Sequence, residues 1–231
     1  MNKLLNNFSF KNRIVFCNGK FIYSSLLCSN ILTIFDGKTD FPLFLSKFFT
    51  KRTIDKYDIN ESFNYAFCNE ICVIDIPDNL YITDPVYLIY INLCDFSGDF
   101  VCQNNFVILG NNSKFILNEV YINDKGNNFL NNVKTNIILK NSSVFKHNII
   151  CDSNLLSGNL FSNYCFTYIV EQYASSIYYS NLIDVKIFTC FLNFSIYLLG
   201  KNCFVYKNYL KVSFYNNLCK YNYVVYHVYP C

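Results

Sequence analysis

The chain has 231 residues, enough to bury a substantial hydrophobic core, and 52% of them are hydrophobic. Its net charge of +3 comes from 19 Lys and Arg against 16 Asp and Glu, and no dense basic stripe interleaves with aromatic residues. This pattern argues against nucleic-acid binding. Asn, Ile, Lys, Tyr and Phe are abundant and Trp is absent, as is typical of AT-rich genomes, so most aromatic residues are interpreted as core and strand residues.

The first seventy residues differ in pattern from the rest. Arg13–Tyr23 predicts a β-hairpin, because two β-rich runs flank an Asn-Gly turn. Phe41–Phe49 has Pro at an early position and predicts a short amphipathic helix, and Ser62–Phe67 predicts a further helix or turn. We therefore expect residues 1–70 to form a small mixed α/β cap.

From Ile71 onward, short β-rich runs alternate with Asn, Asp, Gly and Ser. No long helical period intervenes, which makes a βαβ sheet an unfavourable interpretation, while an antiparallel sandwich stays open. The predicted strands cover Ile71–Ile76, Val86–Ile91, Phe106–Leu109, Phe115–Leu117, Asn136–Leu139, Val205–Tyr209 and Tyr221–Tyr226.

An internal repeat favours a stacked fold over a sandwich. Ile108–Phe115 is echoed thirty residues later by Ile138–Phe145 and again by Leu198–Phe204, with a weaker copy at Ile169–Ser176. Each copy is an apolar run, a polar turn and a second apolar run, and repeats of this length are typical of solenoids. We therefore predict a mainly β protein in which residues 71–231 form a parallel β-helix of stacked coils of about 30 residues.

The cellular compartment is inferred from the absence of targeting signals. The N-terminus is interrupted by polar residues before a secretory signal could form. We therefore expect a cytoplasmic protein whose twelve cysteines stay as thiols, most of them buried. The longest apolar region, Ile187–Leu199, is too short and too polar for a transmembrane helix.

Catalytic motifs are scarce. The sequence has no phosphate-binding glycine loop, nucleophile elbow or H-E-x-x-H helix, and Gly110 and Gly200 are solitary glycines at predicted coil corners. Glycan-cleaving β-helices use clustered carboxylates. The acidic residues of this chain do not recur in phase, so a glycan-cleaving enzyme has little support. Those residues are Asp95, Asp99, Glu119, Asp124 and Asp152.

Only two histidines occur, and His227 is the candidate metal ligand. It lies in the strand-like run Val224–Cys231, and its imidazole together with the Cys231 thiolate would suit a metal such as iron. A packed or capped histidine is the alternative interpretation. His147, within Phe145–Asn148, is interpreted as a polar residue on a strand face.

The order of these motifs resembles the SufB/SufD family of iron–sulfur cluster assembly scaffolds, and within it the SufD branch. Arg13–Gly19 is similar to the family's N-terminal hairpin, Phe63–Phe67 to its Leu-Asn-x-Ala-Phe segment, and His227 with Pro230 to its His-x-x-Pro stretch. Ile76–Asn79 with Pro85 resembles the entry to its β-helix, and Asn105–Glu119 and Asn132–Leu139 resemble two of its coils.

The resemblance implies a right-handed parallel β-helix that pairs with a SufB-like subunit, to which a SufC-like ATPase can also bind. Nascent Fe–S clusters would form at the interface with the help of His227 and Cys231, and no cofactor would be bound stably. The chain would be a scaffold and not an enzyme, since ATP hydrolysis would belong to SufC. Relatives continue beyond the His-containing stretch into a helical C-terminal domain, which we expect to be missing here.

Two further interpretations stay open beside the scaffold. The chain could be a structural β-helix interaction protein without metal chemistry, or a degraded remnant. A β-helix enzyme acting on a glycan would require a carboxylate cluster beneath a groove.

Overall fold

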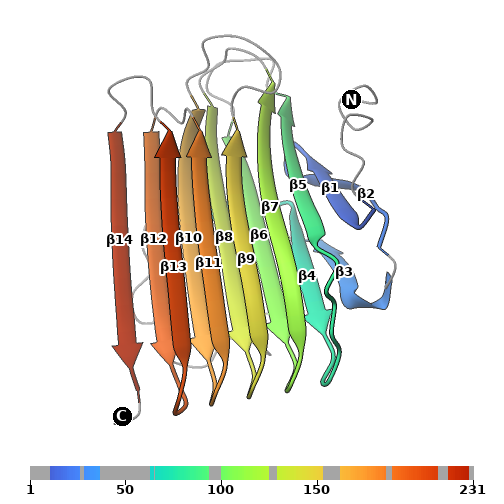
Figure 1. The fold of residues 1–231 in the computed structure, drawn as a ribbon. Coiled ribbons are helices and arrows are strands. Elements are labelled where there is room, and N and C mark those ends of the chain that lie inside the picture. Colours follow the sequence, from blue (N-terminus) through green and yellow to red (C-terminus); the bar gives the residue numbers. More distant parts are fainter. Residues whose placement is uncertain are drawn as a thin grey trace.

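A computed structural model gives the three-dimensional arrangement of the chain. In the part of the chain that the structure describes, 14 strands form two seven-stranded sheets (Figure 1). The structure describes residues 11–26, 29–36, 63–64, 66–93, 100–124, 129–152, 162–185, 189–212 and 218–228. The predicted helix at Phe41–Phe49 lies outside these residues.

The strands alternate between the two sheets along the chain. One sheet has the order β13-β11-β9-β7-β5-β1-β2 and the other β14-β12-β10-β8-β6-β4-β3. Their bounds are β1 (Arg13–Cys17), β2 (Lys20–Ser24), β3 (Leu32–Asp36), β4 (Glu70–Ile76), β5 (Val86–Leu93), β6 (Phe100–Leu109), β7 (Lys114–Asp124), β8 (Phe129–Leu139), β9 (Val144–Asp152), β10 (Ser162–Gln172), β11 (Ile177–Val185), β12 (Thr189–Leu198), β13 (Phe204–Val212) and β14 (Leu218–His227).

The pairing makes the molecule a parallel β-solenoid, as the repeat predicts. From β4 to β14 every pairing within a sheet is parallel, and two strands joined by a tight turn make one coil (Figure 1). Leu109 lies opposite Leu139, thirty residues later, and Leu139 lies opposite Gln172. The weaker copy of the repeat is out of register, because Ile169 lies opposite Asn136 and not opposite Ile138.

Antiparallel strands precede the solenoid at its N-terminal end. β1 and β2 form the predicted hairpin, in which Asn18 and Gly19 both have positive φ. β3 pairs antiparallel with β4 and so ends the second sheet. A 3-10 turn at Ser29–Ile31 leads into β3, and residues 63–64 and 66–67 are helical.

Polar turns that share one backbone feature join the two strands of each coil. Each turn has one non-glycine residue with positive φ, a conformation that Asn tolerates better than most residues. The turns are also bonded to one another, since Asn79 N donates to Asn111 O at 2.8 Å and Asn112 N to Asn141 O at 2.9 Å. The positive-φ residues are Asn79, Asn112, Ser142, Ser175 and Asn202.

Close stacking of the turns explains the two isolated glycines. A Cβ atom at Gly110 would lie 2.5 Å from Asp78 N, and one at Gly200 would lie 2.2 Å from Ala174 N. Both distances are to backbone atoms of the preceding turn, which cannot move aside without disturbing the stack. Glycine is therefore required for the close approach of neighbouring coils.

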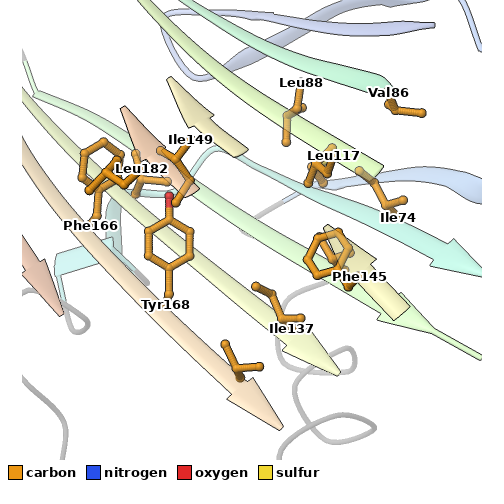
Figure 2. Close-up of a cluster of buried hydrophobic side chains, with 14 of the residues drawn as sticks. Ile74, Val86, Leu88, Leu117, Ile137, Phe145, Ile149, Phe166, Tyr168 and Leu182 are labelled. Atoms are coloured by element: carbon orange, nitrogen blue, oxygen red, sulfur yellow. The ribbon is translucent and has the colours of Figure 1, made fainter. Parts of the chain in front are cut away.

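Apolar and aromatic side chains fill the space between the sheets. Figure 2 shows Leu117 and Phe145 from one sheet with Ile137 and Tyr168 from the other. Phe115 stacks on Phe145 with ring centroids 5.9 Å apart and planes 4° apart. The aromatic-rich composition is thus accounted for in part by stacks that repeat from coil to coil.

Most described cysteines are buried, as expected. All nine are thiols, and only Cys17, Cys203 and Cys219 are partly exposed. Burial raises the pKa of both Cys68 and Cys102 to about 12, which keeps these thiols protonated and unreactive. Among the helical residues that the structure describes, none forms a helix long and apolar enough to cross a membrane.

Candidate functional site

His227 is the last residue of β14 and lies on the interior-facing side of its strand. It is opposite Leu198 of β12, which packs against the core. His227 itself is exposed, because no described strand pairs with the far side of β14. Cys231, its predicted partner, lies outside the described residues. Across the described part of the chain, no group of three or more His, Cys, Asp and Glu side chains is arranged to hold a metal ion.

The C-terminal end of the solenoid presents two strand edges, those of β13 and β14, and we call it the open end. No described strand pairs with the far side of either (Figure 1). Side chains of the interior row are therefore exposed here, including Tyr209 at 41% and Tyr223 at 44%. Equivalent positions in earlier coils, such as Tyr168, are fully buried. The large exposed hydrophobic residues of β13 and β14 are Phe204, Tyr206, Tyr209, Leu210, Tyr221, Tyr223, Val224, Val225 and Tyr226.

Ladders of asparagine side chains also end at the open end. In one ladder Asn148 donates to Asn118, Asn181 to Asn148 and Asn208 to Asn181, at 2.7, 2.7 and 2.9 Å. On the other sheet Asn222 donates to Asn193 at 2.9 Å. Every amide donates toward the preceding coil, so each ladder ends with a side-chain carbonyl at the open end.

Lysines and aromatic rings line the interior side of the open end. Lys207 Nζ lies 3.4 Å from the centroid of the Phe194 ring and 4.4 Å from that of Tyr223. Partial burial lowers the pKa of Lys207 to about 7, while attraction of the ammonium to the ring faces opposes this shift. Lys211 Nζ donates to Cys219 Sγ at 2.9 Å, and the hydroxyls of Tyr209 and Tyr221 are hydrogen-bonded to each other.

A second polar cluster is enclosed in the middle coils, around Glu119. His147 Nε2 lies 3.3 Å from Glu119 Oε1, and both side chains are fully buried. The hydroxyls of Tyr121 and Tyr168 donate to Glu119 Oε2 at 2.9 and 3.0 Å. Thr135 adds a longer contact of 3.4 Å to Oε1. The carboxylate therefore has partners on β7, β8, β9 and β10, which connect the two sheets.

The network continues on both sides of Glu119. Thr135 Oγ1 accepts from Asn105 Nδ2 at 3.2 Å, and Asn105 Oδ1 accepts from Tyr90 at 2.6 Å. On the other side, Nδ1 of His147 is 3.1 Å from the Tyr178 hydroxyl. The hydrogen bonds thus cross several coils within the core.

Burial opposes ionisation of Glu119, but it does not decide the charge of this residue. The adjacent His147 imidazole and the hydrogen bonds from Tyr121 and Tyr168 outweigh burial and hold the pKa of Glu119 below its ordinary value. Burial and the Glu119 charge raise the pKa of Tyr121 and Tyr168 far above the usual range. Glu119 and His147 have no exposed side-chain surface, so we assign this cluster a structural role.

His147 lies on the face of β9 that is turned toward the core, which its interpretation as a polar strand-face residue did not specify. His147 lies on the same face of the strand as Phe145, Ile149 and Cys151, all of which point into the core. This period-two pattern was readable in the sequence and could have placed His147 inside. Glu119, which was considered only as a member of a carboxylate cluster, is the partner that makes its burial possible.

The proximity of Lys211 and Cys190 to Cys219 was not predicted from the sequence. Cys190 and Cys219 are 29 residues apart, close to one coil, and the structure places them directly opposite each other on β12 and β14. Coil-length spacing between cysteines is the signal that could have identified the pair.

Comparisons with known proteins add no assignment. No protein-family model matches the chain, and no curated protein matches it. A parallel β-solenoid fold is what the structure establishes, and any family assignment depends on the sequence motifs.

Proposed function

We propose that the chain is a SufD-like scaffold subunit of an iron–sulfur cluster assembly complex, which pairs with a SufB-like subunit in the cytosol. The sequence motifs support this proposal, and the parallel β-solenoid is the fold that they imply. The observation that carries it is the position of His227 at the end of β14, on an edge open to a second subunit. A cluster forming between two subunits would need such a ligand at their interface.

The backbone of β14 is suited to adding a partner strand. Val228 N donates to Leu198 O at 3.1 Å, so the amides of even-numbered residues in β14 face β12. Those of the odd-numbered residues, such as Tyr223 and Val225, point to the open side because parallel strands alternate in this way. An edge with such a row of donors and acceptors can bind an extended segment of another protein.

Of the two edges, β14 is the better docking strand. The interior row of β13 contains Lys207 and Lys211, and inward-pointing charges on an edge discourage the addition of another strand. The corresponding row of β14 carries Tyr221, Tyr223 and Val225, which are partly exposed and could pack against a partner.

A pair of proline variants tests the docking edge. Val225→Pro removes an amide that faces the open side, so the solenoid should stay folded while co-purification with the SufB-like subunit is lost. Val224→Pro is the matched control, because it removes an amide that bonds to β12 and should lower the melting temperature. Co-purification of folded Val225→Pro at the wild-type level would contradict docking through β14.

His227→Ala tests the role of the histidine separately. The reconstituted complex should form normally but should lose iron uptake and cluster assembly, measured by iron content and by the visible absorption of the cluster. Cluster assembly at the wild-type rate in this variant would contradict a ligand role for His227 but would leave the scaffold role intact.

A structural interaction protein is the second candidate, because the open end supports partner binding without any metal chemistry. It predicts stable binding of the SufB-like subunit, with or without the SufC ATPase, and no iron uptake by the complex. A degraded remnant would bind neither subunit.

A further inference from the structure

Two thiols lie next to each other at the open end. Cys190 and Cys219 are paired in parallel register on β12 and β14, and both are on the interior-facing side of their sheet. Adjacent strands are about 4.8 Å apart, and the stacked rings of Tyr197 and Tyr226 on the same two strands have centroids 4.7 Å apart. A disulfide requires Cα atoms about 4.4–6.8 Å apart, so the pair can be joined without a change of register.

The edge position of β14 makes such a bond geometrically accessible. Disulfide formation draws the two Cβ atoms somewhat closer than the spacing of neighbouring strands. β14 pairs only with β12 among the described strands, so it can shift toward β12 without breaking a second ladder. An equivalent pair in a central strand would be held from both sides.

Cys219 has the surroundings of a reactive thiol. Its sulfur is partly exposed and accepts the hydrogen bond from Lys211 Nζ at 2.9 Å. The Lys211 ammonium thus places a positive charge against the sulfur that would act as the nucleophile. Cys190 is 1% exposed, so an outside reagent reaches Cys219 first.

The other two partly exposed cysteines among the described residues, Cys203 and Cys17, have different surroundings. Cys203 Sγ donates to the carbonyl oxygens of both Gly200 and Tyr173 at 3.2 Å. Burial raises the pKa of Cys17. These two residues are therefore internal controls of similar exposure in the same molecule.

We propose that Cys190 and Cys219 form a redox-active dithiol that exchanges with low-molecular-weight disulfides. The Cys219 thiolate attacks one sulfur of the small disulfide, forming a mixed disulfide and releasing one thiolate. Cys190 gives its proton to that released thiolate and attacks Cys219 Sγ, which breaks the mixed disulfide and releases the second small molecule as a thiolate. This second thiolate takes up the proton that Cys219 lost before the first step. Two protein thiols are oxidised to one disulfide, and the small disulfide is reduced to two thiols.

The bond would fasten the last strand of the solenoid. Because β14 has one neighbour among the described strands, it is held in the sheet from one side only. A Cys190–Cys219 disulfide would hold β14 in place, so the oxidised protein should show slower amide exchange in residues 218–228. In a reducing compartment the bond would be transient, as is usual for regulatory disulfides.

Peptide mapping of the full-length wild-type protein tests the proposal without any variant. The reduced protein is treated with oxidised glutathione under native conditions, quenched with N-ethylmaleimide and digested. A peptide linking Cys190 to Cys219 should be the main product. Glutathione adducts forming at Cys203 or Cys17 as fast as at Cys219, with no linked peptide, would overturn the proposal.

Three variants resolve the steps. Cys190→Ser should accumulate a stable glutathione adduct on Cys219, and Lys211→Met should slow the first step at least about threefold. Cys203→Ser is the matched control and should react as the wild type does. Equal reaction rates in Lys211→Met and the wild type, or no adduct on Cys219 in a folded Cys190→Ser protein, would contradict the mechanism.

Discussion

The middle coils and the open end are built from the same strand pattern but differ in what covers them. In the middle coils an interior-facing histidine, His147, is fully buried and paired with Glu119, whereas at the open end His227 is exposed. Likewise, Tyr168 in the middle coils is fully buried, whereas Tyr223 at the open end is exposed. The repeat therefore specifies where a side chain points, but its chemical environment depends on whether another coil follows.

Replacing each histidine by alanine should give the largest contrast between the two regions. His147→Ala leaves Glu119 as a buried charge without its imidazole partner and should lower the free energy of unfolding by about 3–5 kcal/mol. His227→Ala should change it by no more than about 0.5 kcal/mol, because the side chain is exposed. Urea unfolding followed by circular dichroism measures both, and equal losses would contradict the distinction.

The pH dependence of stability should also originate in the middle coils. The pKa of Glu119 is lower in the folded protein than its ordinary value of 4.5, so its contribution to stability is complete above that pH. The contribution is lost as the pH falls through the lowered pKa. Glu119→Gln should be less stable than the wild type at pH 7, and the difference should shrink on acidification in thermal unfolding experiments. A difference that stays constant down to pH 3 would be inconsistent with an ionised Glu119.

The asparagine ladder allows the same comparison with one residue type. Asn148 both donates to Asn118 and accepts from Asn181, whereas Asn208 only donates to Asn181. Asn148→Ala should therefore cost about 1–3 kcal/mol of unfolding free energy, and Asn208→Ala about 1 kcal/mol or less. Chemical denaturation of the two variants measures both losses of unfolding free energy. A larger loss in Asn208→Ala than in Asn148→Ala would contradict the prediction.

The smallest effect is expected for Lys207 at the open end. Its pKa is lowered to about 7, so between pH 7 and 10.5 the unfolded state binds more protons than the folded state. Stability should consequently rise with pH over this window, and Lys207→Met should remove that component. Partial exposure keeps the effect to a few degrees in melting temperature. An unchanged pH profile in Lys207→Met would show that the rings hold the amine in its charged form.

The sequence was most informative where one chemical pattern recurs at coil spacing. Ile108 and Ile138 lie in register as the repeat predicts, and Gly110 and Gly200 lie at coil corners. The copy at Ile169 was misaligned by two residues, because its coil is longer and contains Glu171 and Gln172 where apolar residues stand elsewhere. Coil length varies with the connecting turns, so a fixed period cannot give every register.

Candidate sites were harder to predict because they depend on contacts between different coils. The pairing of His147 with Glu119 was not predicted, since the two residues are 28 positions apart in sequence and the contact forms only when the coils stack. The Lys211–Cys219 contact links β13 to β14 across the interior, and no local motif marks it. The position of His227 at an edge follows from the strand order, which the motifs alone did not reveal.

Hydrogen–deuterium exchange with and without a SufB-like subunit tests the central claim most directly. The claim is that β14 pairs with a strand of that subunit through its open side. It predicts that complex formation slows exchange in residues 218–228, and most strongly at the odd-numbered amides, while the middle coils stay unchanged. Unchanged exchange in β14 within a stable complex, or protection confined to β1–β3, would contradict it.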